Sequence, residues 1–179
     1  KAQISIYNED CLQALKAMAD KQFDLAIVDP PYGIGAENHA GNKDNGWTQW
    51  AKKDWDKAIP TAEYWQELFR VSKNQIVWGA NYMTEYLPPK MGWIVWDKGQ
   101  RDFSLADGEL AWTSFDKAMR IFTYARAKAL KECKIHPTQK PTDLYKWLLD
   151  KYAKQGDKIL DTHLGSGSIA IACWDMGYD

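Results

Sequence analysis

The stretch LAIVDPPYGIG, residues 25–35, runs an apolar strand into an acid, two prolines and an aromatic residue. Pro30 and Pro31 have no backbone N–H, so the loop after the strand offers carbonyl oxygens, the carboxylate of Asp29 and the ring of Tyr32. Phosphate is commonly bound by backbone N–H donors, which these prolines cannot supply. The loop instead suits a ligand group that carries hydrogens.

A second loop follows another short strand in ILDTHLGSGSIAIA, residues 159–172. Gly165 and Gly167 flank Ser166 before a helix of small residues, and such glycines let the backbone approach a ligand closely. The spacing is not that of a Walker A loop, and the third glycine of the dinucleotide fingerprint is absent. Ligands of open α/β sheets bind at the carboxyl ends of strands. If the strands ending at Asp29 and Asp161 are neighbours, both loops face one crevice.

Strands alternate with helices at the front and the back of the chain. The predicted strands are residues 2–8, 23–28, 75–79, 92–97, 109–115 and 119–125 and a short one that ends at Asp161, with a turn near Asp116 between the fifth and the sixth. The predicted helices are one capped by Asp10, one at 61–72, one at 142–153 and one after the glycine turn. This alternation predicts an α/β fold with a doubly wound, mostly parallel sheet.

The composition is that of an ordinary globular protein. With 179 residues, 45% hydrophobic and 26% charged, the chain is expected to form one domain with a real core. It contains no apolar run of 18 residues and no signal-peptide pattern, which predicts a cytoplasmic protein without a membrane partner. The three cysteines and three histidines are scattered, so no metal site is expected.

Two segments combine basic residues with features of a nucleic-acid interface. The net charge of −1 argues against non-specific coating of nucleic acid, yet residues 117–146 carry eight basic and two acidic side chains. A solvated face is the ordinary interpretation of such a run; beside an active site it also suits phosphates. The polar loop at about 36–58 interleaves tryptophans with lysines. The candidate nucleic-acid contacts are Lys43, Trp47, Trp50, Lys52, Lys53, Arg126, Lys128, Lys131 and Lys134.

The sequence Asp29-Pro30-Pro31-Tyr32, together with the glycine turn, resembles the S-adenosylmethionine-dependent amino-methyltransferases that act on nucleic-acid bases. The order, with the catalytic loop early and the glycine turn late, resembles the permuted β class of DNA methyltransferases. NEDCLQAL at 8–15 and HPTQKP at 136–141 resemble two further motifs of that class. Four motifs in the right order span nearly the whole chain.

This resemblance implies a single catalytic domain, residues 1–179, that methylates adenine in double-stranded DNA as part of a restriction-modification system. The implied catalytic residues are Asp29, Pro30, Pro31 and Tyr32. The implied residues for S-adenosylmethionine are Asp10, Cys11, Asp29, Lys140, Asp161, Thr162, Gly165, Ser166, Gly167 and Ser168. Lys140 is expected to meet the carboxylate of the cofactor. Residues 97–135 are expected to recognise the target, and because this segment is short, a homodimer is one way to complete recognition.

In the implied mechanism, the Asp29 carboxylate and the Pro30 carbonyl accept the two hydrogens of an exocyclic amino group, which frees the nitrogen lone pair. Tyr32 is expected to stack on a base flipped out of the duplex. Purely structural interpretations stay open: an Asx-turn at Asp29, a helix cap at Asp10 and a core position for Tyr32.

Two departures from the class bear on the cofactor. Asp161-Thr162-His163 stands where the class has Asp-Pro-Phe. The strand whose terminal acid would bind the cofactor ribose would begin just past Asp179, so the cofactor half is expected to be incomplete or completed by further chain. The alternatives are methylation of cytosine, of RNA or of a protein amide, a non-catalytic DNA-binding remnant, and a nicotinamide-dependent oxidoreductase.

Overall fold

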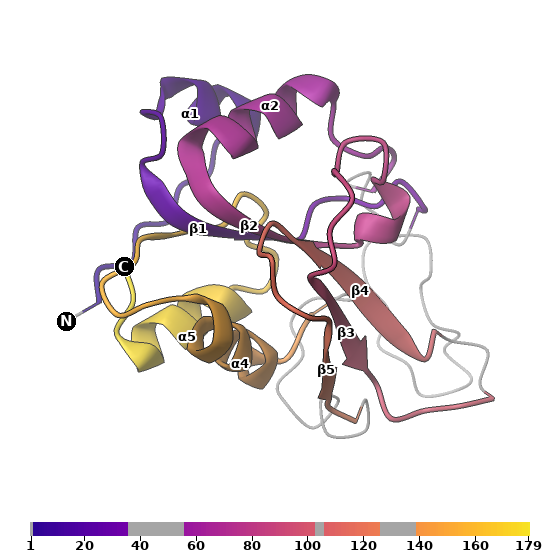
Figure 1. Cartoon of the computed structure of the whole chain (residues 1–179). Coiled ribbons are helices and arrows are strands. Elements are labelled where there is room, and N and C mark those ends of the chain that lie inside the picture. Colours follow the sequence, from indigo (N-terminus) through magenta and orange to yellow (C-terminus); the bar gives the residue numbers. More distant parts are fainter. Residues whose placement is uncertain (1, 36–55, 103–105, 126–138) are drawn as a thin grey trace, which may run out of the picture.

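The computed structural model describes residues 2–35, 56–102, 106–125 and 139–179, in which a six-stranded sheet carries helices on both faces (Figure 1). The strands are β1 (Phe23–Val28), β2 (Ser72–Trp78), β3 (Trp93–Asp97), β4 (Gly108–Thr113), β5 (Arg120–Thr123) and β6 (Ile159–Leu160). The helices are α1 (Cys11–Ala17), α2 (Ala62–Val71), the short 3-10 helix η3 (Ala80–Tyr82), α4 (Thr142–Tyr152) and α5 (Ser168–Met176).

The sheet has the order β5-β3-β4-β2-β1-β6. Strand β1 pairs in parallel with both β2 and β6, and β3 pairs in parallel with β5, whereas β4 runs antiparallel to β2 and β3. The predicted α/β class with a mostly parallel sheet is therefore confirmed. Because β1, β2 and β6 are parallel, their carboxyl ends lie on the same side of the sheet. The Asp29–Tyr32 loop and the glycine turn both begin there.

Each face of the sheet has its own core, because neighbouring residues of a strand point to opposite faces. On the face of α4 and α5 the core contains Leu25, Ile27, Ile76, Trp78, Leu144, Leu148 and Ile169. On the face of α1 and α2 it contains Ala26, Val28, Val77, Leu15, Trp65 and Leu68. Figure 1 shows these two helix pairs on opposite sides of the sheet. The near-continuous apolar run of β1 thus reflects burial on both faces.

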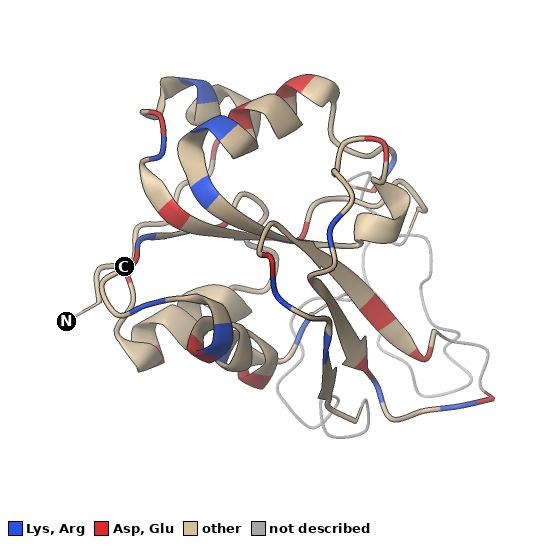
Figure 2. Ribbon diagram, in the orientation of Figure 1, with Lys and Arg blue, Asp and Glu red and all other residues tan. Residues whose placement is uncertain are grey.

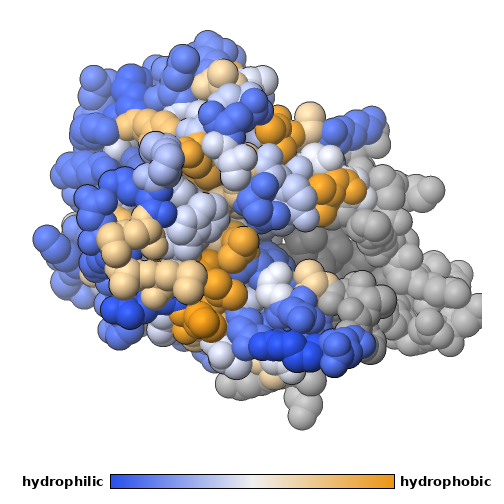
Figure 3. Space-filling model, turned by 45° about the vertical axis from the view of Figure 1, so that its right-hand side comes forward, coloured by the Kyte–Doolittle hydropathy of each residue, from blue (hydrophilic) through white to orange (hydrophobic). Residues whose placement is uncertain are grey.

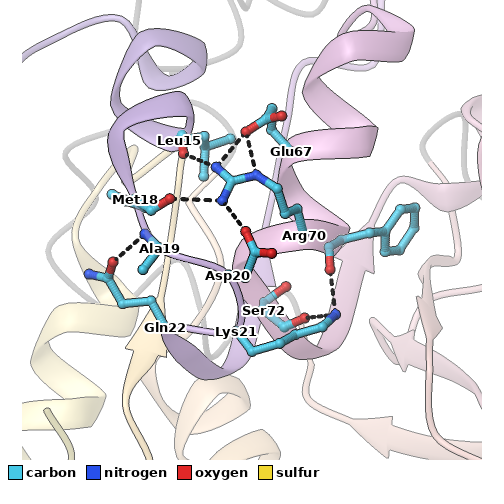
Figure 4. A network of polar contacts seen from close by, with 10 residues as sticks. Leu15, Met18, Ala19, Asp20, Lys21, Gln22, Glu67, Arg70 and Ser72 are labelled. Carbon is cyan, nitrogen blue, oxygen red and sulfur yellow. Dashed lines mark hydrogen bonds and ion pairs between the residues drawn. The ribbon is translucent and has the colours of Figure 1, made fainter.

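A network around Arg70 joins the two helices of one face (Figure 4). The Arg70 guanidinium donates to the backbone carbonyls at the end of α1 and to two carboxylates, namely Leu15 O, Met18 O, Asp20 and Glu67. The Nζ of Lys21 donates to the carbonyls of Phe69 and Ser72 at the end of α2. These cations satisfy carbonyls that a helix end leaves without partners, so the turn that leads into β1 is fixed from both helices.

Residues 2–8 were predicted to form a strand, and this prediction is wrong. The segment forms no ladder with any described strand; Ile6 and Tyr7 are 64% and 74% exposed. Within the described ranges β6 pairs only with β1, so no strand lies beside residues 2–8 to accept their backbone hydrogen bonds. The other predicted strands are present. However, β4 and β5 do not form a hairpin, because β3 lies between them.

The surface is mixed in character. Lys and Arg are interspersed with Asp and Glu on α2 and α4 (Figure 2). On the face shown in Figure 3, apolar side chains lie in several patches between hydrophilic ones. In the part of the chain that the structure describes, no helix is long and apolar enough to cross a membrane.

Candidate active site

The two predicted loops meet at one edge of the sheet. Because Ala26 lies opposite Leu160 in the parallel pair β1–β6, Asp29 and Asp161 follow neighbouring strands on the same side. Burial, and to a smaller extent the charge of Asp29, raises the pKa of Asp161 to about 7. The side chain of Asp29 is 21% exposed, so it lies at the carboxyl edge and not in the apolar interior.

Both oxygens of the Asp29 carboxylate have a donor. The hydroxyl of Tyr32 donates to Oδ1 at 2.7 Å, and Nζ of Lys140 donates to Oδ2 at 2.6 Å. Lys140 precedes α4 in the chain and is only 3% exposed. Its ammonium also lies 3.1 Å from Oε2 of Glu109 on β4. One buried cation therefore bridges two carboxylates, and the orientation of Asp29 is fixed from two sides.

The charges of this cluster hold one another in their ionised forms. Burial favours a raised pKa for Glu109, but Lys140 and Lys98 outweigh it and lower that pKa to about 2. Burial likewise favours a lowered pKa for Lys140, yet Asp29 and Glu109 reverse the shift and raise it. Lys98 pairs with Oε1 of Glu109 at 2.7 Å. The result is a chain of alternating charges that runs from Lys98 to Asp29.

The ring of Tyr32 is packed against the end of β2. Gly79 has φ +66°, and a Cβ there would lie 2.1 Å from the Tyr32 ring. Tyr82 of η3 stacks on Tyr32 with 5.4 Å between ring centroids and 20° between planes. Tyr82 is itself 44% exposed. Next to Asp29 the structure thus presents a pair of stacked tyrosines, and Tyr82 is its more accessible member.

Asp56 binds the loop that follows β1, although it lies more than 20 residues further along the chain. Its carboxylate is buried, and Oδ1 accepts hydrogen bonds from Tyr32 N at 2.5 Å and from Gly33 N at 2.8 Å. The backbone carbonyl of Asp56 accepts a third bond, from Gly35 N, at 3.1 Å. The first two N–H groups after the paired prolines therefore share a single oxygen.

The glycine turn after β6 faces open space. Gly165 and Gly167 have φ +54° and +75°; a Cβ at Gly167 would meet no atom within 4 Å, and one at Gly165 only the His163 carbonyl at 3.8 Å. A cavity of about 700 Å³ lies beside the turn, which is a size that holds a cofactor. Its wall is formed by residues 3–7, α1, β6 with the residues that follow it, and α5, and it includes Cys11, Asp161, Thr162, Leu164 and Ile169. The free space around the glycines and the size of the cavity fit S-adenosylmethionine.

Polar contacts connect the wall of this cavity. Thr162 Oγ1 lies 2.7 Å from the Tyr64 hydroxyl and 2.8 Å from His163 Nδ1, and Cys11 Sγ lies 3.8 Å from His163 Nε2. Burial lowers the pKa of His163 to about 4 and raises the pKa of Cys11. Both groups are therefore neutral near pH 7, so they form a neutral polar contact behind the cavity wall and not a thiolate–imidazolium pair.

The structure places the predicted cofactor residues in four different surroundings, of which the ion-pair cluster contains both Asp29 and Lys140. Cys11, Asp161 and Thr162 line the cavity, and Gly165, Ser166, Gly167 and Ser168 form the turn beside it. Asp10 caps α1, because its Oδ1 accepts from Gln13 N at 3.0 Å, and it is not part of the cavity wall. Lys140 contacts Asp29 and Glu109, where the sequence predicted a contact with the cofactor.

Two further predictions concern the nucleic-acid contacts and the metal site. All nine candidate nucleic-acid contacts lie in 36–55 and 126–138, which the structure does not describe. Among the described residues no group of three or more His, Cys, Asp or Glu side chains could hold a metal ion.

Sequence reasoning missed Glu109, Asp56 and Tyr82. Glu109 contacts the Tyr32 hydroxyl across 77 residues of chain, and Asp56 contacts the loop across 23 to 24 residues, and no local motif marks either residue. For Tyr82 a signal was present, because an aromatic residue follows a glycine at the carboxyl end of a predicted strand.

Comparisons with known proteins agree with this geometry. A profile of the N6/N4 DNA methylase family matches residues 76–179. The type II methyltransferase M.HpaI of Haemophilus parainfluenzae is 26% identical over 212 residues, covering 92% of this chain and 64% of M.HpaI. The chain thus spans less than two thirds of that relative's length.

Solved structures share the fold. The M1.HpyAVI–SAM complex has a TM-score of 0.61 at 21% identity, covering 99% of this chain and 91% of the other. The PvuII DNA methyltransferase, described as cytosine-N4-specific, has a TM-score of 0.58 at 10% identity, covering 94% and 77%. At these identities the likeness concerns the fold.

Proposed function

Since this chain belongs to the N6/N4 DNA methylase family, whose profile matches residues 76–179, we propose that it transfers a methyl group from S-adenosylmethionine to the exocyclic amino group of adenine in DNA. The observation that carries the proposal is the position of Asp29. Its carboxylate, held by Tyr32 and Lys140, ends β1 beside the glycine turn that follows β6.

The chemistry divides between cofactor and protein. When bound, S-adenosylmethionine supplies a methyl group that its sulfonium already makes electrophilic. The protein acts on the nucleophile: the Asp29 carboxylate and the Pro30 carbonyl accept the amino hydrogens, which favours a tetrahedral nitrogen with a free lone pair. The same two acceptors stabilise the positive charge that develops on the nitrogen. Because Asp29 is fixed by Lys140, this acceptor is oriented before the substrate arrives.

A base inside the duplex cannot reach Asp29, so the target nucleotide is flipped out. Stacking on an aromatic side chain offsets part of the cost of leaving the duplex. Tyr32 and Tyr82 lie stacked next to Asp29, and the exposure of Tyr82 supports a role as the platform that the base meets first.

Adenine is favoured because an Asp, and not a Ser, begins the Asp29–Tyr32 motif, as in the adenine-modifying enzymes that the sequence resembles. Cytosine N4 is the second candidate, favoured by the shared fold of the PvuII enzyme. Both amino groups present two hydrogens and suit the same pair of acceptors.

The proposed partner is double-stranded DNA, contacted by the basic residues of 117–146. Part of the predicted recognition segment 97–135 is occupied by β4 and β5 of the sheet, which leaves few residues to read a sequence. A second copy of the chain is therefore proposed to complete recognition. In line with the type II relative M.HpaI, we further propose that the protein acts in a restriction-modification system in the cytoplasm.

A transfer assay tests the proposal. The purified protein is incubated with methyl-labelled S-adenosylmethionine and duplex DNA, single-stranded RNA or a protein mixture, and the labelled nucleoside is identified after digestion. Label in N6-methyladenine that disappears in Asp29→Ala is the expected result. Asp116→Ala, which removes an 82% exposed carboxylate paired with Lys90, is the matched control and should keep the wild-type rate.

Other outcomes decide between the candidates. Label in N4-methylcytosine would select the second candidate, and label in RNA or protein would overturn DNA as the substrate. Cofactor binding without transfer to any acceptor would favour the non-catalytic DNA-binding remnant.

A further inference from the structure

The catalytic loop contains donors that compete with the substrate for Asp29. In an Asx-turn or a related motif, a carboxylate accepts a hydrogen bond from a backbone N–H two or three residues later. At the second position after Asp29 stands Pro31, which has no N–H, and Pro30 before it has none either. The first local backbone donors are therefore the N–H groups of Tyr32 and Gly33, whereas the side-chain hydroxyl of Tyr32 already donates to Asp29 Oδ1.

Asp56 occupies both of these donors. Its Oδ1 lies 2.5 Å from Tyr32 N and 2.8 Å from Gly33 N, and the Asp56 residue is 1% exposed. Hydrogen bonds to an ionised acceptor are roughly twice as strong as neutral ones, so the two N–H groups are bound firmly. The Gly35 N–H donates to the Asp56 carbonyl, which fixes the same stretch a third time.

We infer that Asp56 is a positioning residue of the methyl-transfer reaction: it binds the Tyr32 and Gly33 N–H groups and so keeps these backbone donors off Asp29. The carboxylate then carries only the Tyr32 hydroxyl and Lys140, one donor on each oxygen, and each oxygen keeps room to accept a hydrogen of the substrate amino group. The prolines remove two competing donors and Asp56 occupies the next two. The inference rests on the proposed function, because it gives Asp29 the task of accepting the amino hydrogens.

The same bonds orient the second acceptor. The φ angles of both prolines are fixed, so the path of the loop depends on where the next N–H groups are held. With Tyr32 and Gly33 bound to Asp56, the Pro30 carbonyl keeps one direction relative to Asp29. A shift of about 1 Å in such a group can lower the rate roughly a hundredfold.

The test compares Asp56→Ala, which has no acceptor, with Asp56→Asn, which keeps one oxygen in the same place. Asp157→Ala is the matched control, because Asp157 accepts the N–H of Lys154 at 2.8 Å in a turn before β6. For each protein we would measure kcat, the Kd of S-adenosylmethionine and the hydrogen exchange of the Tyr32 and Gly33 amides.

The expected result is a kcat lower by about a hundredfold in Asp56→Ala, with the Kd of the cofactor unchanged and the two amides exchanging faster. Asp56→Asn should recover kcat to within about tenfold of wild type, since a neutral oxygen still accepts both bonds more weakly. A merely structural role would lower the stability of both variants without this separation of kcat from Kd.

Three results would overturn the inference. They are a kcat of Asp56→Ala within about threefold of wild type, an Asp56→Asn variant as impaired as Asp56→Ala, and unchanged exchange of the two amides. If Asp56→Ala does not fold, Asp56→Asn decides alone: faster exchange at both amides with a lower kcat supports the inference, and wild-type values refute it. If the wild type itself transfers no methyl group, the proposed function fails and this inference falls with it.

Discussion

Nζ of Lys140 lies 2.6 Å from Oδ2 of Asp29, although 111 residues separate them in the chain. The same ammonium lies 3.1 Å from Glu109, so the buried cation has one carboxylate on each side. Removing the Lys140 ammonium would leave the carboxylates of Asp29 and Glu109 close together where little water can reach them. This relationship makes Lys140 the residue on which the ionised state of the site depends.

Lys140→Met should therefore abolish most methyl transfer and lower the free energy of unfolding at pH 7 by about 3 kcal/mol, because breaking a buried pair leaves unpaired charge. In the wild type the pKa of Glu109 is lowered to about 2, so its stabilising contribution is present above about pH 4.3 and is lost as the pH falls towards 2. In the variant Lys140 no longer outweighs burial, so the pKa of Glu109 should rise above its unfolded value and stability should recover as the pH falls from 7 to 5.

Urea unfolding of both proteins at pH 5 and pH 7 measures this. Lys146→Met is the control, since Lys146 pairs with Asp175 at the surface and its loss should change stability little. Equal pH dependence in Lys140→Met and wild type would contradict the assignment.

Gly79→Ala should destabilise the protein and displace Tyr32. The Cβ would lie 2.1 Å from the Tyr32 ring, and the φ of +66° is itself unfavourable for alanine. Gly156→Ala carries the same backbone penalty at φ +89° but meets no atom within 4 Å. The difference between the two variants, expected to be about 1–3 kcal/mol in thermal or urea unfolding, isolates the clash. Methyl transfer should fall in Gly79→Ala alone; equal stability of the two variants would show that Tyr32 moves aside freely.

Gly167→Ala should weaken cofactor binding while leaving the fold intact. Within the described chain its Cβ would meet nothing within 4 Å, so its cost in unfolding should match that of Gly156→Ala. The added methyl group would occupy the space in which a ligand approaches the backbone of the turn. Calorimetric titration with S-adenosylmethionine should give a Kd raised at least tenfold in Gly167→Ala and unchanged in Gly156→Ala. An unchanged Kd in both variants would place the cofactor elsewhere.

The pH dependence of stability should change in opposite directions when Asp161 and His163 are replaced. The pKa of Asp161 is about 7 in the folded protein and ~3.9 unfolded, so the folded state binds the extra proton and stability falls as the pH rises from about 4 to 7. The pKa of His163 is about 4 folded and ~6.5 unfolded, so stability rises over nearly the same interval.

In the wild type these two slopes oppose each other. Asp161→Asn should therefore gain stability steadily as the pH rises from 4.5 to 7, and His163→Phe should lose it. Urea unfolding at half-unit pH steps measures both slopes. Slopes of the same sign in the two variants would refute the raised pKa of Asp161 or the lowered pKa of His163.

The sequence by itself determined the local features of this protein. Strand β1 has the bounds that its apolar run predicted, and Asp10 caps α1 as its position before Cys11 indicated. The prolines after Asp29 and the glycines around Ser166 restrict or permit particular backbone angles wherever they stand, so the two loops could be recognised without a structure. The alternation of strands and helices likewise predicted the α/β class.

Only the tertiary structure decided which groups meet. The partner of Lys140 proved to be Asp29 and Glu109, and the donors of the catalytic loop proved to be bound by Asp56. Residues 2–8 have the pattern of a strand but form none within the described chain, because a strand exists only where a neighbour accepts its hydrogen bonds. Backbone preferences act within a few residues and are written in the sequence. Charge pairing and strand pairing act through space, between residues that only the folded chain brings together.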